Sequence, residues 1–237
     1  MEKLQPQPRF PLPAPWGQRE LWMAFGLALL LYLLGSIVGG WIVLEMEWRQ
    51  TPWIGAVLAL AQVGLLLPPL RIVARYGNPA VLLGLHRWQW QMLGEVTVML
   101  GLGFCGMMVW GLLLYPLGIQ AQEPIVPLFG EGRGALISAL LVGGVLAPIV
   151  EEVVFRGFLF AGLLKFLSSV PAALGSAALF GALHLQPFAF PVLFLLGILL
   201  ATLYYRTNSL WPPILMHLTI NVVAILVQYL AAEQGLI

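Results

Sequence analysis

Seven long runs of apolar residues set the strongest limit on the fold of this chain. Of its 237 residues, 60% are hydrophobic, only 9% are charged and none is Asp. The runs cover residues 21–44, 53–73, 92–115, 134–165, 171–186, 189–206 and 210–231. About 20 apolar residues suffice for a helix to cross a bilayer, and these runs are too long and continuous for the strands of a membrane barrel. The sequence therefore predicts an all-α, polytopic transmembrane helical bundle.

The fourth run, residues 134–165, is too long for a single span of about 20 residues. It is either one long kinked helix, with Pro148 interrupting its hydrogen bonds after Gly143 and Gly144, or two consecutive helices. We therefore expect seven or eight membrane helices.

The chain divides into two parts by composition. Residues 1–20 are rich in proline and predict a flexible tail, whereas residues 21–237 form the transmembrane domain. The Trp-containing and Arg-containing segment 78–91 predicts an interfacial element. A net charge of +1 suggests no nucleic-acid partner, and the single cysteine excludes an intrachain disulfide.

The distribution of Lys and Arg predicts the orientation. With the N-terminus in the cytoplasm, the cytoplasmic side would hold Lys3, Arg9, Arg19, Arg71, Arg75, Arg87, Lys165 and Arg206. Only Arg49 and Arg133 would fall outside. Since cytoplasmic segments carry an excess of Lys and Arg, we expect an integral protein of the plasma (inner) membrane with a cytoplasmic N-terminus.

Three charged residues lie close together inside the fourth run: Glu151, Glu152 and Arg156. Ionisable residues at membrane depth are costly and usually functional. A structural alternative is an ion pair between Glu152 and Arg156, which are spaced to meet across one helical turn. That pair leaves Glu151 unexplained.

Three further polar residues fall within later runs. At 1.5 Å per residue, Glu151, His184 and Asn221 lie about 21, 22 and 18 Å from the cytoplasmic boundary, and His217 about 12 Å. His217 and Asn221 are four residues apart and share one helical face. Each of these polar side chains could instead form only a structural hydrogen bond to a neighbouring helix. Together with the glutamate, they could activate water and hold an oxyanion.

Three motifs in order carry a family resemblance: Glu-Glu-x-x-x-Arg at 151–156, Phe-x-x-x-His at 180–184 and His-x-x-x-Asn at 217–221. The chain resembles the CPBP intramembrane proteases, also called Abi or CAAX-protease-like proteins, and is similar to type II CAAX prenyl endopeptidases. The protease-like core would cover residues 134–231.

The resemblance implies hydrolysis of a peptide bond of a membrane-associated or lipidated peptide, in a membrane cavity open toward the cytoplasm. Glu151 and His184 would position and deprotonate water, and His217 and Asn221 would donate hydrogen bonds to the oxyanion. The implied supporting residues are Glu152, Arg156 and Phe180, with Phe180 lining the cavity.

No cofactor is favoured, although zinc is possible with Glu151, His184 and His217 as its ligands. The sequence contains no His-Glu-x-x-His helix of the zincin type. The alternative function is that of a non-enzymatic membrane assembly, immunity or carrier protein whose polar cluster stabilises packing.

Overall fold

The computed structural model describes residues 14–46 and 53–234, and these ranges are helical with short connections. Its main helices are α1 (Gln18–Glu45), α2 (Trp53–Tyr76), α3 (Pro79–Leu82), α4 (Met92–Leu114), α8 (Ser169–Ala182), α9 (Phe190–Thr207) and α10 (Trp211–Glu233). A continuous helix, Gly132–Leu163, lies between α4 and α8. Two short 3₁₀ helices, Tyr115–Leu117 and Val126–Phe129, interrupt the connection that precedes it.

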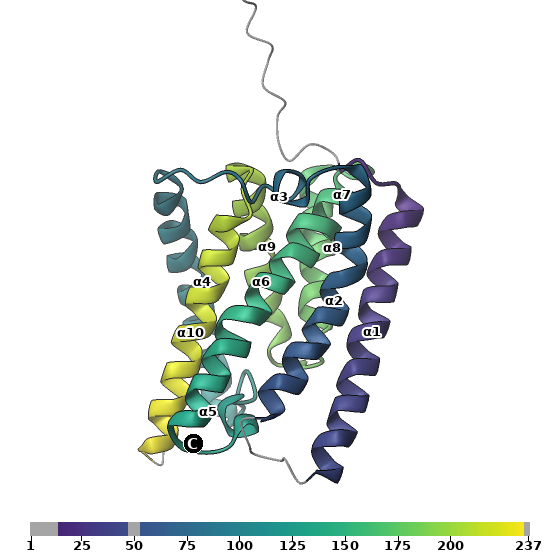
Figure 1. The fold of residues 1–237 in the computed structure, drawn as a ribbon. Coiled ribbons are helices and arrows are strands. Elements are labelled where there is room, and N and C mark those ends of the chain that lie inside the picture. The colour runs from purple at the N-terminus through teal and green to yellow at the C-terminus, as the bar shows by residue number, and fades with distance from the viewer. Residues whose placement is uncertain (1–13, 47–52, 235–237) are drawn as a thin grey trace, which may run out of the picture.

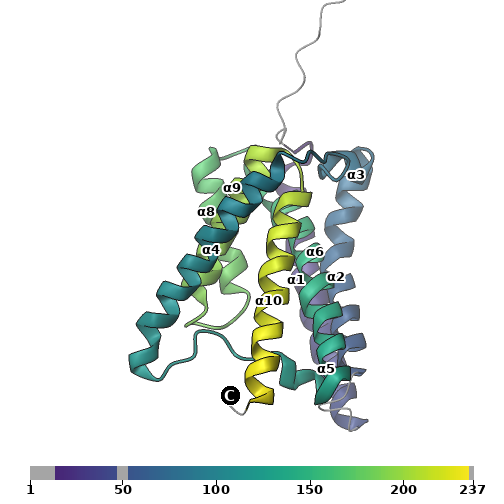
Figure 2. The same ribbon diagram turned by 90° about the vertical axis from the view of Figure 1, so that its left-hand side faces the viewer.

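The predicted all-α membrane bundle is confirmed. Within the described residues, six helices are long and apolar enough to cross a membrane, and no strand occurs. The seventh expected span, 171–186, is represented by α8, which has only 14 residues. The helices pack side by side, roughly parallel to one long axis (Figures 1 and 2).

The fourth apolar run is one helix, so the alternative of two consecutive helices is wrong. Two π-helical stretches lie within it, η3 (Leu140–Leu146) and η4 (Val153–Phe160). Between them lies α6 (Ala147–Glu152), which holds Pro148 in its first turn. The wider π turn just before α6 lets the helix continue past a residue that has no N–H to donate.

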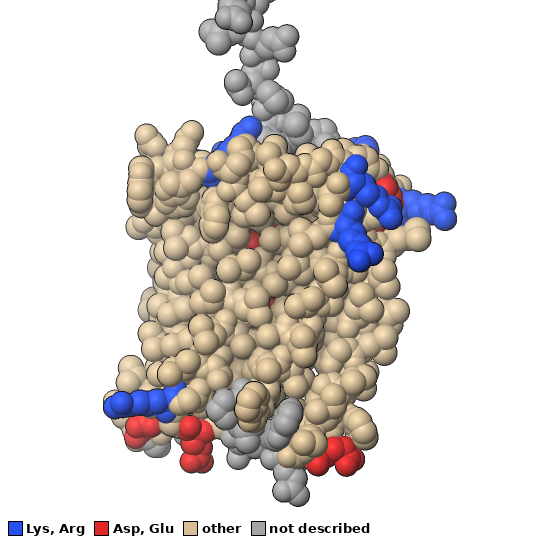
Figure 3. All heavy atoms as spheres, in the orientation of Figure 1, with Lys and Arg blue, Asp and Glu red and all other residues tan. Residues whose placement is uncertain are grey.

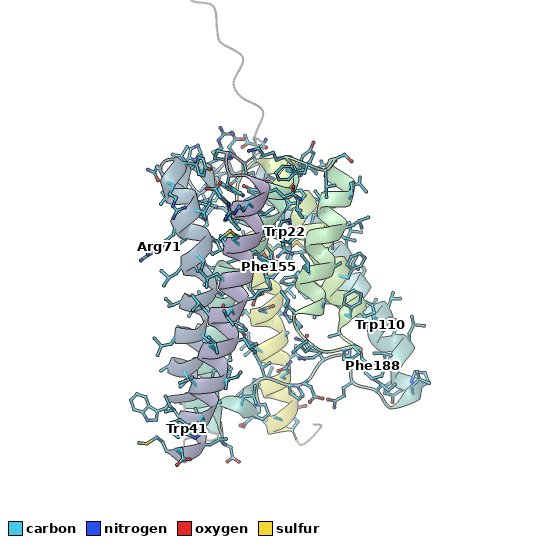
Figure 4. All side chains as sticks on the ribbon, turned by 90° about the vertical axis from the view of Figure 1, so that its right-hand side faces the viewer. Trp22, Trp41, Arg71, Trp110, Phe155 and Phe188 are labelled. Carbon is cyan, nitrogen blue, oxygen red and sulfur yellow. The ribbon has the colours of Figure 1, made fainter. Side chains whose placement is uncertain are left out.

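The two ends of the bundle differ in the sign of their charged side chains (Figure 3). We call one end the basic end, because its helix termini and loops carry Arg71, Arg75, Arg87, Lys165 and Arg206 against Glu20 and Glu95. At the opposite, acidic end lie Glu45, Glu123, Glu131, Arg133 and Glu233. Trp22 and Trp41 lie toward the two ends of α1 (Figure 4), in the manner of the tryptophans that border a bilayer.

The expected flexible tail ends before residue 20, because residues just ahead of α1 are packed onto the bundle. Trp16 is buried and stacks on Phe158, with 5.1 Å between ring centroids. The Lys165 ammonium donates hydrogen bonds to the carbonyls of Pro15 and Trp16, at 3.0 and 3.1 Å. The first 13 residues of the expected tail lie outside the described residues.

Candidate active site

The long helix carries the two glutamates at the junction of α6 and η4. Glu152 is fully buried, and its Oε1 accepts a 2.9 Å hydrogen bond from Nη1 of the equally buried Arg156. The expected ion pair across one turn is therefore confirmed. The Arg156 guanidinium also lies 4.5 Å from the centre of the Phe180 ring, close enough for a cation–π contact.

His217 connects α10 to both glutamates. Its Nδ1 lies 2.8 Å from Oε1 of Glu152, and its Nε2 lies 3.8 Å from Oε2 of Glu151. Glu152 is buried, while the Glu151 side chain is 17% exposed. Glu151 is therefore the carboxylate that small molecules can reach. The Phe180 ring meets the His217 ring edge-to-face and restricts its rotation.

His184 lies just past the C-terminal end of α8. Its Nδ1 is 2.8 Å from the carbonyl oxygen of Phe180, one helical turn earlier. Because a carbonyl only accepts hydrogen bonds, this contact assigns the hydrogen to Nδ1. In the neutral imidazole Nε2 is then an acceptor, as a proton-accepting group requires.

Asn221 lies one turn after His217 on α10 and is tied to the long helix. Its Nδ2 donates a 2.9 Å hydrogen bond to the carbonyl of Gly143, within η3. The side-chain NH₂ group has two hydrogens, so one remains free for another acceptor.

The four residues implied as catalytic line one cavity of about 100 Å³: Glu151, His184, His217 and Asn221. Helices α4, α9 and α10 form most of its apolar wall. The sequence predicts overlapping depths for these side chains, and the fold brings them together. Their catalytic roles stay predictions.

The first cavity continues toward the acidic end of the bundle. Gln122, in the connection after α4, and Gln228, near the end of α10, complete its lining. The resemblance implies a cavity open to the cytoplasm, whereas the charge distribution puts the cytoplasm at the basic end. The lining of this cavity extends away from the basic end, as Gln228 near the end of α10 shows.

A second cavity, of about 430 Å³, meets the first at Glu151 and His184, which line both. Tyr32 of α1 and Gln62 of α2 are among its other lining residues. Phe155 contributes to its wall and lies beside α1 in the middle of the bundle (Figure 4). Gln62 was not among the predicted site residues, although a lone amide inside an otherwise apolar span is the signal that marks such a residue.

The zinc alternative requires three ligands to converge on one point. Among the residues that the structure describes, no group of three or more His, Cys, Asp or Glu side chains could hold a metal ion. The expected set of Glu151, His184 and His217 thus does not form such a group here. Metal dependence stays a prediction.

Comparison with known proteins identifies relatives of the segment that carries these residues. Residues 133–223 match the model of a family described as type II CAAX prenyl endopeptidase Rce1-like. All three motifs lie inside that match. The predicted resemblance to the CPBP family is confirmed.

A protein of Bacillus subtilis (strain 168), named "Putative membrane peptidase YdiL", is 26% identical over 139 residues. That alignment covers 59% of this chain and 55% of the relative, so the chain spans about half the length of the curated relative that it matches. No significant match to a solved structure was found. The two matches support a membrane protease in general, in a protein whose helices make it an integral membrane protein.

Proposed function

We propose that this protein is an intramembrane endopeptidase that hydrolyses a peptide bond of a membrane-associated or lipidated peptide by using water activated by Glu151 and His184. One observation carries the proposal. A reachable carboxylate, two imidazoles and an amide from three separate segments line a single cavity inside an apolar bundle. A polar cluster that served packing alone would have no need of a cavity.

Glu151 and His184 are suited to activate the water. Glu151 takes one proton from water, and the oxygen attacks the carbonyl carbon of the peptide bond. His184, held by the Phe180 carbonyl, presents Nε2 as a second acceptor that orients the water. As the C–N bond breaks, the proton passes to the leaving amine.

His217 and Asn221 are suited to bind the oxyanion. Asn221 keeps one N–H free, while Nδ1 of His217 is already engaged by Glu152. For Nε2 to donate as well, His217 must be an imidazolium.

The orientation and the substrate side belong to the same proposal. We propose that the basic end and the N-terminus face the cytoplasm, and that the membrane is the plasma (inner) membrane. The first cavity then leads toward the opposite face, and the substrate is a membrane peptide that reaches the site from within the bilayer or from that face.

Replacing Glu151 tests the function. The Glu151→Gln variant nearly conserves shape but removes the base, and we expect a loss of cleavage of about 10²–10⁴-fold. Protein termini are compared by mass spectrometry between membranes of cells that make the wild-type protein or the variant at equal abundance. Termini that disappear in the variant identify the substrates.

The matched control is Glu131→Gln, which removes an exposed glutamate at the acidic end. This control should leave the set of termini unchanged. If Glu151→Gln produces the wild-type set of termini, the protease assignment fails. A growth phenotype without any change in termini would instead favour the non-enzymatic alternative.

A further inference from the structure

Gln62 is a buried polar residue that the mechanism does not use. It lies in the middle of α2, is 7% exposed, and is flanked by Ala61 and Val63. Its side-chain oxygen has no hydrogen-bond partner in the part of the chain that the structure describes. A buried acceptor without a partner destabilises a protein, so the oxygen at this position calls for a ligand that donates a hydrogen bond to it.

The position of Gln62 connects it to the proposed chemistry. It lines the second cavity, and Glu151 and His184 line that cavity as well as the first. An extended chain that lies in the second cavity and ends beside Glu151 would thus pass Gln62 before it reached the activated water. The oxyanion donors His217 and Asn221 line only the first cavity of the two.

We propose that Gln62 is a substrate-positioning residue that hydrogen-bonds the main chain of the peptide on the second-cavity side of the cleaved bond. This inference rests on the proposed protease function and assigns that cavity to one flank of the substrate. The side-chain oxygen accepts a hydrogen bond from a peptide N–H, and the side-chain NH₂ donates one to a peptide carbonyl. The Gln62 amide thus pairs with both the donor and the acceptor of a peptide main chain.

The lining of the second cavity favours a peptide main chain over a hydrocarbon chain. Most of its wall is apolar and includes Leu29, Leu65 and Leu183. Such a wall accommodates apolar side chains of a substrate. A hydrocarbon chain would fill that volume and leave the Gln62 oxygen unpaired. A peptide fills the same volume and supplies the missing donor.

Two substitutions separate positioning from structure. Gln62→Leu keeps a similar volume but cannot form hydrogen bonds, while Gln62→Asn keeps the amide on a shorter side chain. Gln91→Leu, at an exposed position beside the start of α4, is the matched control. The probe is a synthetic peptide that copies one terminus lost in the Glu151→Gln comparison, with several residues on each side of the cleavage point.

We expect Gln62→Leu to lower kcat/KM about tenfold, the effect of one hydrogen bond to the substrate, mainly through a higher KM. Gln62→Asn should recover part of that loss, and Gln91→Leu should show none. The melting temperature of Gln62→Leu should equal or exceed that of the wild type, since an unpaired buried group is removed. A structural role would instead lower the melting temperature.

Methylation of single backbone nitrogens in the probe identifies the contact. Methylation at one position should lower the kcat/KM of the wild type about tenfold. The same methylation should not lower the kcat/KM of Gln62→Leu further, as expected for two changes that remove the same hydrogen bond. Unchanged kcat/KM in Gln62→Leu, or equal methylation effects in both proteins, overturns the proposal. If Glu151→Gln cleaves like the wild type, the protease function itself fails, so the two failures are distinguishable.

Discussion

At the scale of single residues, Glu152 joins the long helix to α10. One oxygen of its carboxylate meets both Arg156, at 2.9 Å, and His217, at 2.8 Å. The sequence predicted the first contact from a four-residue spacing. It could not predict the second, because the rotation of α10 about its axis decides which side chain meets Glu152. Glu152 therefore orients His217 in addition to neutralising Arg156.

Replacing Glu152 should damage both folding and turnover. In Glu152→Gln, Arg156 stays buried without its counter-charge, and breaking such a pair typically costs 3–5 kcal/mol. We expect a lower melting temperature in detergent, together with reduced cleavage because His217 loses its fixed orientation. Both are measured on protein purified at equal yield.

A second ion pair provides the control for this variant. Glu95 accepts a 2.7 Å hydrogen bond from Arg206 at a much more exposed site. Glu95→Gln should change stability by about 1 kcal/mol or less. Wild-type stability with no turnover in Glu152→Gln would mean that the roles of the two glutamates are reversed.

At the scale of helices, the two π stretches each supply a main-chain carbonyl to another helix. The Gly143 carbonyl accepts from Asn221, and the Phe155 carbonyl accepts from the hydroxyl of Ser176 at 3.1 Å. π turns often mark functional sites, and here they border the segment that holds both glutamates. The sequence indicated a long helix with an irregularity near Pro148, but hydrophobicity alone does not distinguish a kink from a wide turn.

The contact of α8 with α9 depends on a glycine. A Cβ atom added to Gly197 would lie 2.7 Å from Cβ and 2.8 Å from Cα of Ala177. We therefore expect Gly197→Ala to push the helices apart and to destabilise the protein by about 1–3 kcal/mol. Thermal unfolding in detergent measures this loss.

Gly101→Ala on α4 is the control, because a Cβ at Gly101 meets nothing within 4 Å. Alanine favours a helix more than glycine does, so this variant should be at least as stable as the wild type. Equal stability of the two variants would show that α8 and α9 are not in close contact.

At the scale of the whole molecule, the separation of charges predicts which end faces the cytoplasm. In a Cys105→Ala background, single cysteines are introduced by Gln120→Cys near the acidic end and Ser168→Cys near the basic end. Both positions are exposed. A membrane-impermeant maleimide should label Gln120→Cys in intact cells and Ser168→Cys only after permeabilisation. The reverse pattern would put the N-terminus outside.

Metal dependence is also a property of the whole purified protein. We expect it to hold no stoichiometric zinc and to keep its activity after chelation and removal of the chelator. Elemental analysis and cleavage of a peptide substrate provide the measurements. Activity that is lost on chelation and returns in proportion to added zinc would make Glu151, His184 and His217 ligands, while leaving the protease assignment in place.

The shortness of α8 has a consequence for the surrounding lipid. Its 14 residues extend only about 21 Å, whereas the hydrocarbon layer is about 30 Å thick. The chain beyond it must satisfy its main-chain groups at depth, as the Trp110 indole does for the Phe188 carbonyl at 2.7 Å (Figure 4). A bilayer that thinned to match α8 would shorten the path that water takes to His184, which lies just past the C-terminal end of that helix.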